Sequence, residues 1–329
     1  MNMPTVKSPG GSRILGVGAY RPVRVVDNNE ICQHIDSSDE WIRRRSGIVT
    51  RRFAGPDETV ITMAAEAARK ALAHGGIDPK DIGAVLLASM SFLEQTPHAA
   101  PRIAQLLGVS AAALDVSAAC AGFSYALALA SSLVRSGQVS HVVVIGSERM
   151  SDVVDPTDRG TAFLFGDGAG AVVVGAAETP GIGPVVWGST GEGHQLITYE
   201  HSWTTAGQQA LRPRMRMAGT EVFRWAIDVV PDLCRQALDA AGLSADDLAA
   251  YIPHQASGRI VERTAAALGL GPHTVIARDV VRSGNTSAAS IPLAMDDLLS
   301  QGAISTGDHA LLVGFGAGLA YAAQVVTVP

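Results

Sequence analysis

The hydrophobic and polar positions of this chain alternate in the manner of strands and helices that follow one another. Continuous valine-rich runs at residues 142–146 and 170–175 are typical of strands buried on both faces of a sheet. Apolar side chains recur at helical spacing over residues 59–74, and Gly75 and Gly76 then allow a left-handed cap, so a helix is predicted to end there. This order of elements predicts an α/β protein.

The same pattern of elements occurs twice along the chain. Residues 63–85 align with residues 229–251 at an offset of 166, close to half of the 329-residue length, and Gly76 falls on Gly242. The match covers a helix, a turn and a strand in order; a chance similarity of two alanine-rich helices is the alternative. We therefore predict three segments, a disordered tail at 1–12 and two like halves at 13–177 and 178–329.

Composition excludes several classes of protein. A hydrophobic content of 47% and a charged content of 17% predict a large core. The net charge of −6 argues against a general nucleic-acid binder, and no apolar run approaches the ~20 residues that a membrane helix needs. Three scattered cysteines are too few for a disulfide framework or a cysteine-based zinc site, and the N-terminus lacks the apolar core of a signal peptide. We expect a cytoplasmic protein that binds no metal, nucleic acid or membrane.

Three polar residues are predicted to lie at the C-terminal ends of strands, where open α/β sheets place their ligands. Cys120 lies between a predicted strand and helix, among small residues that leave its sulfur accessible, and a helix N-terminus lowers a thiol pKa. His254 follows a predicted strand, and Asn285 lies in the matching turn of the second half. The alternatives are an inert buried cysteine, a structural histidine that caps a helix, and a turn-forming asparagine.

Two other segments suggest nucleotide binding. The glycine-rich stretches 166–171 and 314–319 superficially resemble a dinucleotide fingerprint, but each leads into a strand pattern rather than a helix, so we expect no NAD. Trp41 lies among several arginines on a helix that Ser37 and Glu40 are predicted to start as a capping box. A flat ring beside guanidinium groups suits a nucleotide, and a solvated basic helix is the alternative.

Taken together, these segments resemble the β-ketoacyl-acyl-carrier-protein synthase III family, the initiating condensing enzymes of the thiolase superfamily, in its actinobacterial form. The resemblance runs over residues 14–328, nearly the whole chain. It is carried by seven ordered motifs: SDEWI (38–42), AACAGF (118–123), DPTDRGT (155–161), FGDGAGA (165–171), PHQA (253–256), GNTSAAS (284–290) and GFGAG (314–318). The resemblance implies an α/β thiolase-like fold, with two pseudo-symmetric halves in five α-β-α-β-α layers, and a homodimer.

The resemblance also implies a reaction. Cys120 accepts an acyl group from a short acyl-CoA, and malonyl-acyl carrier protein then enters. His254 and Asn285 hydrogen-bond its thioester oxygen while CO₂ departs, and the carbanion attacks the acyl-cysteine. The backbone N–H groups of Cys120 and Ala317 form the oxyanion hole; the family has Gly at the latter position, so a positive φ at Ala317 would be strained. Coenzyme A is a substrate here, and no metal or NAD is needed.

Further contacts follow from the same resemblance. The adenine of CoA is expected between the Trp41 ring and the Arg159 guanidinium. The pantetheine arm is expected to pass Ser257, which replaces the family's Asn and weakens one contact. A small Thr in the acyl pocket, reaching across the dimer, hints at a roomy pocket. The residues concerned are Trp41, Arg159 and Arg45 for the nucleotide, Gly219, Thr220 and Ser257 for pantetheine, Thr96 and Met150 for the acyl pocket, and Arg224, Arg259 and Arg263 for carrier-protein docking.

Other activities on this fold are weighed by single residues. A degradative thiolase needs a second active-site cysteine near the C-terminus, and none follows Cys234. A hydroxymethylglutaryl-CoA synthase needs a glutamate close to Cys120, and the motif around it contains none. A non-decarboxylating acyltransferase, moving an acyl group from CoA or a carrier protein to an alcohol or amine, stays open, as does an acyl-CoA-binding module without turnover.

Overall fold

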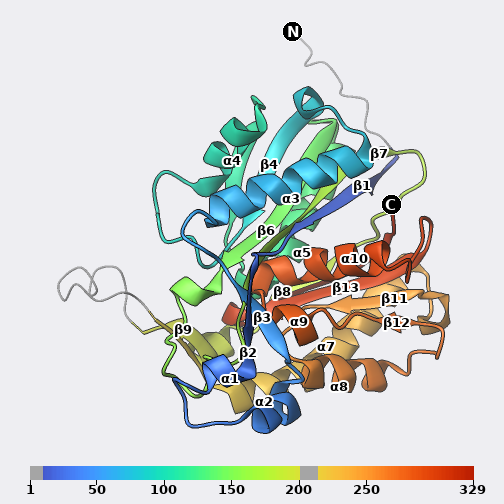
Figure 1. The fold of residues 1–329 in the computed structure, drawn as a ribbon. Helices are drawn as coiled ribbons and strands as arrows, with labels where there is room; N and C mark the ends of the chain where they lie inside the picture. The colour runs from blue at the N-terminus through green and yellow to red at the C-terminus, as the bar shows by residue number, and fades with distance from the viewer. Residues whose placement is uncertain (1–9, 201–213) are drawn as a thin grey trace.

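The computed structural model describes residues 10–200 and 214–329, and two five-stranded mixed sheets form its frame (Figure 1). The first sheet has the order β1-β7-β6-β4-β5 and the second β12-β11-β13-β14-β8. The strands of the first are β1 (Gly11–Tyr20), β4 (Ile82–Ala88), β5 (Ala112–Val116), β6 (His141–Arg149) and β7 (Asp167–Ala177). Those of the second are β8 (Val186–Ser189), β11 (Ala250–Pro253), β12 (Val275–Ile276), β13 (His309–Gly316) and β14 (Ala320–Thr327).

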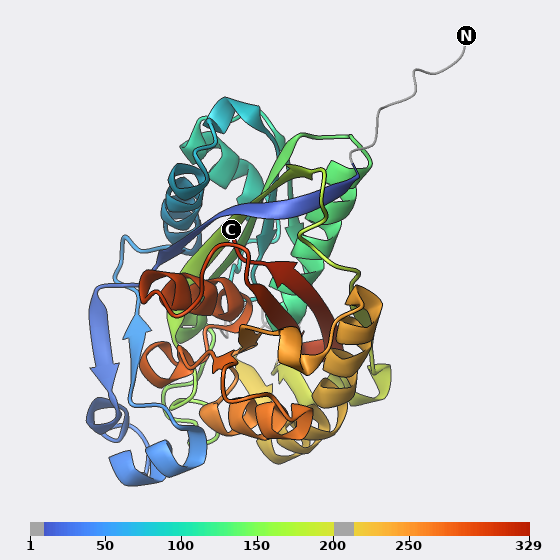
Figure 2. The same cartoon turned by 90° about the vertical axis from the view of Figure 1, so that its right-hand side faces the viewer.

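Helices lie between the two sheets and on both outer faces, which gives the five α-β-α-β-α layers that the family resemblance implies (Figures 1 and 2). The middle layer is α5 (Gly122–Arg135) and α10 (Ser290–Ser300). The outer helices are α3 (Val60–Gly75) and α4 (Ala99–Leu107) on the first sheet and α7 (Gly219–Ala241) and α8 (Gly258–Leu268) on the second.

Alternation along the strands explains why the layers hold together. In β6, Val142 and Val144 pack into the core shared with α5 and α10, whereas Val143 and Ile145 pack under α3. Successive side chains of a strand point to opposite faces, so a strand covered by helices on both sides must be apolar throughout. The valine-rich runs that predicted buried strands therefore mark the two central strands, β6 and β7.

The two halves repeat each other, as the offset of 166 residues predicts. Their sheets share one order and one pattern of parallel and antiparallel pairs, with β1, β7, β6, β4 and β5 corresponding to β8, β14, β13, β11 and β12. The matching helices α3 and α7 end in left-handed glycines, Gly76 with φ 62° and Gly242 with φ 68°. Because a residue with a Cβ is strained at such φ values, the same cap is built with glycine in both halves.

Two details of the sequence prediction are wrong. The tail does not extend to residue 12, because Gly11 and Ser12 already pair with Ala177 and Ala176 at the start of β1; residues 1–9 lie outside the described residues. The cap of the helix that carries Trp41 is Ser38, one residue later than predicted: its hydroxyl accepts the backbone N–H of Trp41.

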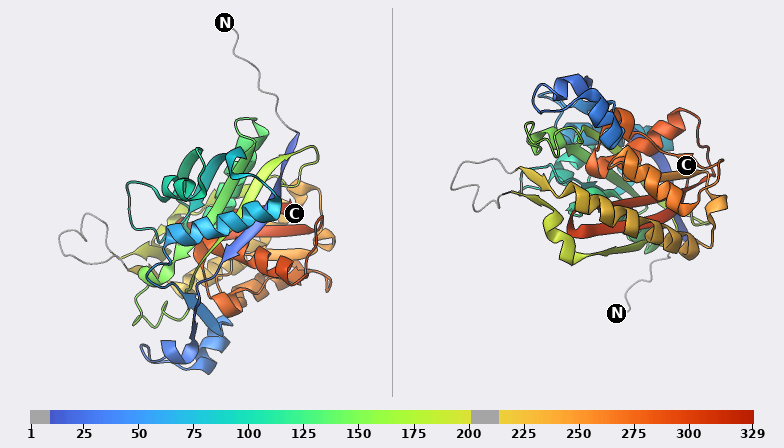
Figure 3. Two further views of the ribbon diagram at one scale, coloured as in Figure 1. Left: turned by 45° about the horizontal axis from the view of Figure 1, so that its top comes forward. Right: turned by 90° about the horizontal axis from the view of Figure 1, so that it is seen from below.

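Small elements, of which the sequence predicted only the helix that carries Trp41, surround one end of the sheets (Figure 3). The helix α2 contacts α8. No described helix is long and apolar enough to span a membrane. These small elements are α1 (Asn28–Ile31), α2 (Asp39–Ser46), α9 (Val280–Ser283), the hairpin β2 (Arg24–Asp27) and β3 (Thr50–Phe53), and the pair β9 (Ile197–Tyr199) and β10 (Met215–Met217).

Candidate active site

Cys120 lies in a single 3₁₀ turn, Ala119–Ala121, between β5 and α5. The preceding residue, Ala119, has a positive φ of 45°, which turns the chain sharply into the helix. On the other side the end of β13 approaches very closely: a Cβ placed on Gly316 would lie 2.7 Å from Cys120 Cβ and 3.1 Å from Sγ. Glycine at this position therefore makes room for the cysteine side chain.

The three polar residues predicted at strand ends meet in one small apolar cavity of about 40 Å³. His254 follows β11 directly, and Asn285 follows α9 and precedes a second 3₁₀ turn, Ser287–Ala289. All the remaining side chains of this cavity are apolar. The full lining is Met90, Cys120, Phe165, Ile197, Met215, Met217, Val222, His254, Ala256, Asn285, Phe315 and Gly316.

Cys120 is buried rather than accessible, and its environment differs from the expectation of an activated thiolate. Burial raises the pKa of the Cys120 thiol to about 12, against a smaller lowering by the Ser287 hydroxyl, which donates to Sγ at 3.2 Å. The prediction that the helix N-terminus yields a low pKa is therefore wrong, because desolvation of the charged form is the larger effect. Ser287 has a positive φ of 48°.

The orientation of the Asn285 amide follows from one hydrogen bond. The backbone N–H of Ser287 donates to Asn285 Oδ1 at 2.9 Å. Because an N–H can only donate, the atom that it meets is the amide oxygen. The NH₂ group of Asn285 is then left as a donor toward the cavity that this residue lines.

His254 is held as a neutral ring. Burial lowers its pKa to about 3, since no charged partner compensates for removing the imidazolium from water. Its Nδ1 lies 2.8 Å from Ser290 Oγ, and the edge of the ring system meets Phe315 in a T-shaped contact with centroids 5.2 Å apart. A neutral imidazole offers one donor nitrogen and one acceptor nitrogen.

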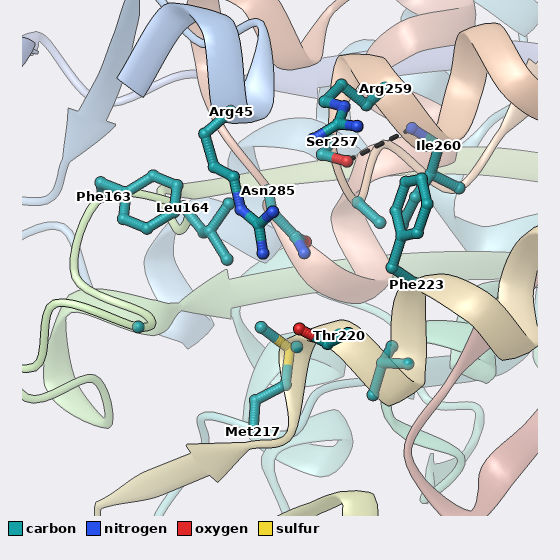
Figure 4. Close-up of a pocket in the computed structure, with 14 residues that line it drawn as sticks. Arg45, Phe163, Leu164, Met217, Thr220, Phe223, Ser257, Arg259, Ile260 and Asn285 are labelled. Carbon is teal, nitrogen blue, oxygen red and sulfur yellow. Dashed lines mark hydrogen bonds between the residues drawn. The ribbon is translucent and has the colours of Figure 1, made fainter. Parts of the chain in front are cut away.

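A second, more open cavity of about 160 Å³ adjoins the first (Figure 4). The two share Met217, Val222, Ala256 and Asn285. Arg45, Arg259 and Thr220 also line the outer cavity, so a ligand can present an anionic group to arginines while it reaches toward Asn285. Figure 4 shows these side chains around one space, with the Ser257 hydroxyl linked to Ile260.

Comparisons with known proteins agree with this site. A family model described as 3-oxoacyl-[acyl-carrier-protein] synthase III matches residues 114–191, and its C-terminal counterpart matches residues 238–328. The chain is 53% identical over 331 aligned residues to β-ketoacyl-[acyl-carrier-protein] synthase III 1 of Streptomyces coelicolor, covering 97% of this chain and 96% of the relative. This chain belongs to the 3-oxoacyl-[acyl-carrier-protein] synthase III family.

Other synthase III relatives extend the match. The mycobacterial enzyme of Mycobacterium marinum is 50% identical, with 96% of this chain and 95% of the relative covered. The crystal structure of a priming β-ketosynthase from a polyketide biosynthetic pathway has a TM-score of 0.95 and 46% identity over 100% of this chain and 98% of its own. A synthase III from Pseudomonas aeruginosa gives a TM-score of 0.90 with 37% identity over 97% and 98%. The predicted actinobacterial type is confirmed.

The residues that the synthase III resemblance assigns to CoA lie along the outer cavity and its rim. Arg45, Gly219, Thr220 and Ser257 line the cavity. The Arg159 guanidinium lies 4.5 Å from the centre of the Trp41 ring, and its Nε donates to the Asp36 carbonyl at 2.6 Å. The two groups thus stack directly on each other.

Two positions depart from the family pattern, and each has a structural account. Ser257 is the N-cap of α8, where its hydroxyl oxygen accepts the Ile260 N–H at 3.4 Å; its hydrogen stays available to the cavity. Ala317 is not among the described residues with positive φ, and the neighbouring Gly318 takes the left-handed conformation with φ 125°. An alanine at 317 is therefore not strained in the way that a positive φ would require.

Besides Trp41, Arg159 and Ala317, four assigned residues lie outside both cavities. Thr96 is exposed on the loop before α4, and Met150 is fully buried behind Phe165 and Met215, which line the inner cavity. Arg224 and Arg263 are exposed on α7 and α8. Near them Arg259 stacks on Phe223 at 5.3 Å and reaches the outer cavity.

Several groups at the site were not found from the sequence. Glu148 is fully buried at the end of β6, and the backbone N–H groups of Met90 and Ser91 donate to it at 3.0–3.2 Å. The strand-end rule that selected His254 could have found it. Ser287 and Ser290 lie inside the GNTSAAS motif, but their hydrogen-bond partners depend on a turn geometry that has no sequence signal.

The described residues contain no cluster of side chains suited to bind a metal ion. No group of three or more His, Cys, Asp or Glu side chains comes together within residues 10–200 and 214–329. Both glycine-rich stretches lead into strands, β7 and β14, as predicted. Their glycines serve close packing: a Cβ on Gly170 would lie 2.7 Å from Pro292 Cβ.

Proposed function

We propose that this chain is a β-ketoacyl-acyl-carrier-protein synthase III that condenses a short acyl-CoA starter with malonyl-acyl carrier protein, initiating fatty acid or polyketide synthesis. The observation that carries the proposal is the meeting of Cys120, His254 and Asn285 in one apolar cavity. The relatives that are named as synthases III and share about 50% sequence identity with this chain support the same function.

In the first step the Cys120 sulfur attacks the thioester carbonyl of the acyl-CoA. The carbonyl carbon forms a bond to Sγ, its bond to the CoA sulfur breaks, and the thiol proton leaves with CoA. The backbone N–H groups of Cys120 and Ala317 donate to the oxygen that becomes negative. A donor of this kind contributes roughly 3 kcal/mol to the transition state.

In the second step malonyl-acyl carrier protein replaces CoA. The bond between the α-carbon and the malonyl carboxylate breaks, CO₂ leaves, and the electron pair forms an enolate on the thioester. Nε2 of the neutral His254 and the NH₂ of Asn285 donate to the enolate oxygen. The α-carbon then bonds to the acyl-cysteine carbonyl carbon and the bond from that carbon to Sγ breaks, which yields a 3-oxoacyl-carrier protein. Cys120 leaves as a thiolate and takes a proton from water, which restores the thiol.

The apolar walls suit this chemistry. Loss of CO₂ removes a charge from the reacting carboxylate and spreads charge over an enolate, which a water-poor cavity with fixed donors stabilises well. Excluding water also protects the acyl-cysteine from hydrolysis. The cavity is lined by Met90, Phe165, Ile197, Met215 and Phe315 around the three polar groups.

The outer cavity holds CoA in this proposal. Arg45 pairs with phosphate, and Gly219, Thr220 and Ser257 follow the pantetheine arm toward Cys120. An adenine between Trp41 and Arg159 must displace the guanidinium that now lies 4.5 Å from the ring centre. Thr96 and Met150 shape the acyl pocket, the former from the partner of a homodimer.

The remaining parts of the proposal concern partners and surroundings. Arg224, Arg259 and Arg263 dock the acidic carrier protein beside the outer cavity, which would reconcile a net charge of −6 with an anionic partner. The reaction uses no metal or NAD and takes place in the cytoplasm. The halves at residues 13–177 and 178–329 supply the nucleophile and the two donors, respectively.

Intact-protein mass spectrometry tests the proposal most directly. The protein is mixed with acetyl-, isobutyryl-, hexanoyl- or malonyl-CoA, with Cys120→Ala as control. We expect an acyl mass shift that disappears in the variant, and CO₂ release once malonyl-acyl carrier protein is added. Loading without CO₂ release would favour a non-decarboxylating acyltransferase, and no loading from any CoA would contradict a CoA-primed synthase.

A further inference from the structure

Ser290, the first residue of α10, contacts the His254 ring and does not line the inner cavity. It is fully buried, and its Oγ lies 2.8 Å from Nδ1 of the ring. The same oxygen accepts the backbone N–H of Gln255 at 3.2 Å. Ser290 is thereby tied to the two residues that follow β11.

The hydrogen of this hydroxyl has a single acceptor within the described part of the chain. The Gln255 N–H is itself a donor and cannot take it. Other buried hydroxyls on helices donate to the carbonyl four residues earlier, as Ser46 and Thr264 do, but Ser290 makes no such bond. A buried hydroxyl that lacks an acceptor destabilises the fold, so the hydrogen points at Nδ1 of His254.

The tautomer of the ring then follows. A neutral imidazole whose Nδ1 accepts a hydrogen bond carries its own hydrogen on Nε2. Nε2 has no hydrogen-bond partner among the described residues, and the ring lines the inner cavity. The edge contact with Phe315 at 5.2 Å keeps the ring from turning.

We propose that Ser290 is a positioning residue that holds His254 as the Nε2–H tautomer, so that the ring donates into the cavity during condensation. This inference rests on the proposed function, which gives His254 its role at the enolate oxygen. The inference also separates the loading step from the condensation step, because the hydroxyl that contacts Cys120 is that of Ser287 and not that of Ser290. Removing the Ser290 hydroxyl therefore impairs condensation and spares the loading of Cys120.

Long-range ¹H–¹⁵N correlation spectra of histidine-labelled protein read the tautomer directly. The signals of His254 are identified by their loss in His254→Gln, and the pattern expected for wild type is a protonated Nε2 beside an accepting Nδ1. A protonated Nδ1 in wild-type protein would overturn the proposal without any Ser290 variant. This readout needs no substrate, so it stands even if the condensing function fails.

Kinetics of variants supply the second readout. In Ser290→Ala we expect condensation with malonyl-acyl carrier protein to slow on the order of tenfold, less than the ~10²–10³-fold cost of deleting an oxyanion donor. Acyl loading of Cys120 should stay within about twofold of wild type. Ser290→Thr, which keeps the hydroxyl, should recover part of the loss, and Ser290→Cys replaces Ala if the latter does not fold.

The matched control is Ser300→Ala at the other end of the same helix. The Ser300 hydroxyl is exposed and donates to the Asp297 carbonyl at 2.9 Å, far from either cavity, so both steps should be unchanged. Equal losses of loading and condensation in Ser290→Ala, or no loss in either, would overturn the proposal. A wild-type protein that neither loads nor condenses would instead overturn the proposed function.

Discussion

Two turns of the same shape face each other at the centre of the molecule, and only one carries a cysteine. Ala119–Ala121 leads into α5, and Ser287–Ala289 leads into α10, the two helices of the middle layer. Each turn begins with a non-glycine residue at positive φ, 45° at Ala119 and 48° at Ser287. The structural counterpart of Cys120 is therefore Ala288, and Asn285 lies three residues before it rather than opposite the cysteine.

Each turn is also packed against a glycine on a central strand of the other half. A Cβ on Gly316 of β13 would lie 2.7 Å from Cys120 Cβ, and one on Gly146 of β6 would lie 2.3 Å from the Ala288 carbonyl oxygen. The difference lies in what is presented. The first turn presents a sulfur, whereas the second presents Asn285, Ser287 and Ser290 as donors. The same backbone turn thus holds the cysteine in one half and the hydrogen-bonding side chains around it in the other.

The largest effect expected from breaking this arrangement is on stability, in Gly146→Ala. The new methyl meets only backbone, Ala288 O at 2.3 Å and Ala289 Cα at 2.9 Å, so a whole turn must shift. Overpacking of this kind costs typically 1–3 kcal/mol, and rigid backbone places this case at the upper end. Urea unfolding measures it, with Gly191→Ala as control because nothing lies within 4 Å of a Cβ there. Equal midpoints would contradict the close approach.

The mirror-image change, Gly316→Ala, should damage chemistry more than folding. Its methyl meets Cys120 at Cβ (2.7 Å), at the backbone N (3.1 Å) and at Sγ (3.1 Å), so the turn that carries the sulfur must shift. A reacting atom displaced by about 1 Å can lose roughly 10²-fold in rate. Mass spectrometry of samples quenched at successive times measures the rate of acyl loading. The unfolding midpoint of the same variant measures its stability. Normal loading in this variant would show that Cys120 does not need its present position.

The sequence predicted the frame and the reacting groups because both have local signatures. Paired glycine caps at Gly76 and Gly242 and the 166-residue repeat indicated two like halves. Strand ends selected Cys120, His254 and Asn285, which the structure brings to one cavity. The burial of Cys120 and the contact between Ser290 and His254 depend on how β13 and α10 pack on distant residues. No local pattern of residues encodes such packing.

The second turn supports the first through Ser287, and Ser287→Gly tests this link. Glycine accepts the φ of 48° and removes the CH₂OH side chain, whose hydroxyl donates to Cys120 Sγ at 3.2 Å. Hydrogen bonds to charged groups contribute about 1.5–3 kcal/mol, so alkylation of Cys120 by iodoacetamide at fixed pH should slow by roughly ten- to a hundredfold. Ala119→Gly is the matched control, with the same backbone change in the first turn and no hydroxyl lost. A rate as fast as that of the control would exclude the support.

The smallest effect concerns charge, since burial keeps both Cys120 and His254 neutral at neutral pH. The pKa of His254 is about 3 in the folded protein, whereas an unfolded histidine has a pKa of about 6.5, so below that value the unfolded chain binds the extra proton. This contribution to stability is fully present above pH 6.5 and is lost progressively as the pH falls toward 3.

Between pH 7 and 5.5 the difference amounts to about 1 kcal/mol, which His254→Gln should remove from the slope of unfolding free energy against pH. Urea titrations of both proteins at several pH values supply that slope. Parallel curves would mean that His254 is not held neutral by burial. In that case the ring would enter condensation as a cation, and the donor supplied by the second half would not depend on the hydroxyl of Ser290.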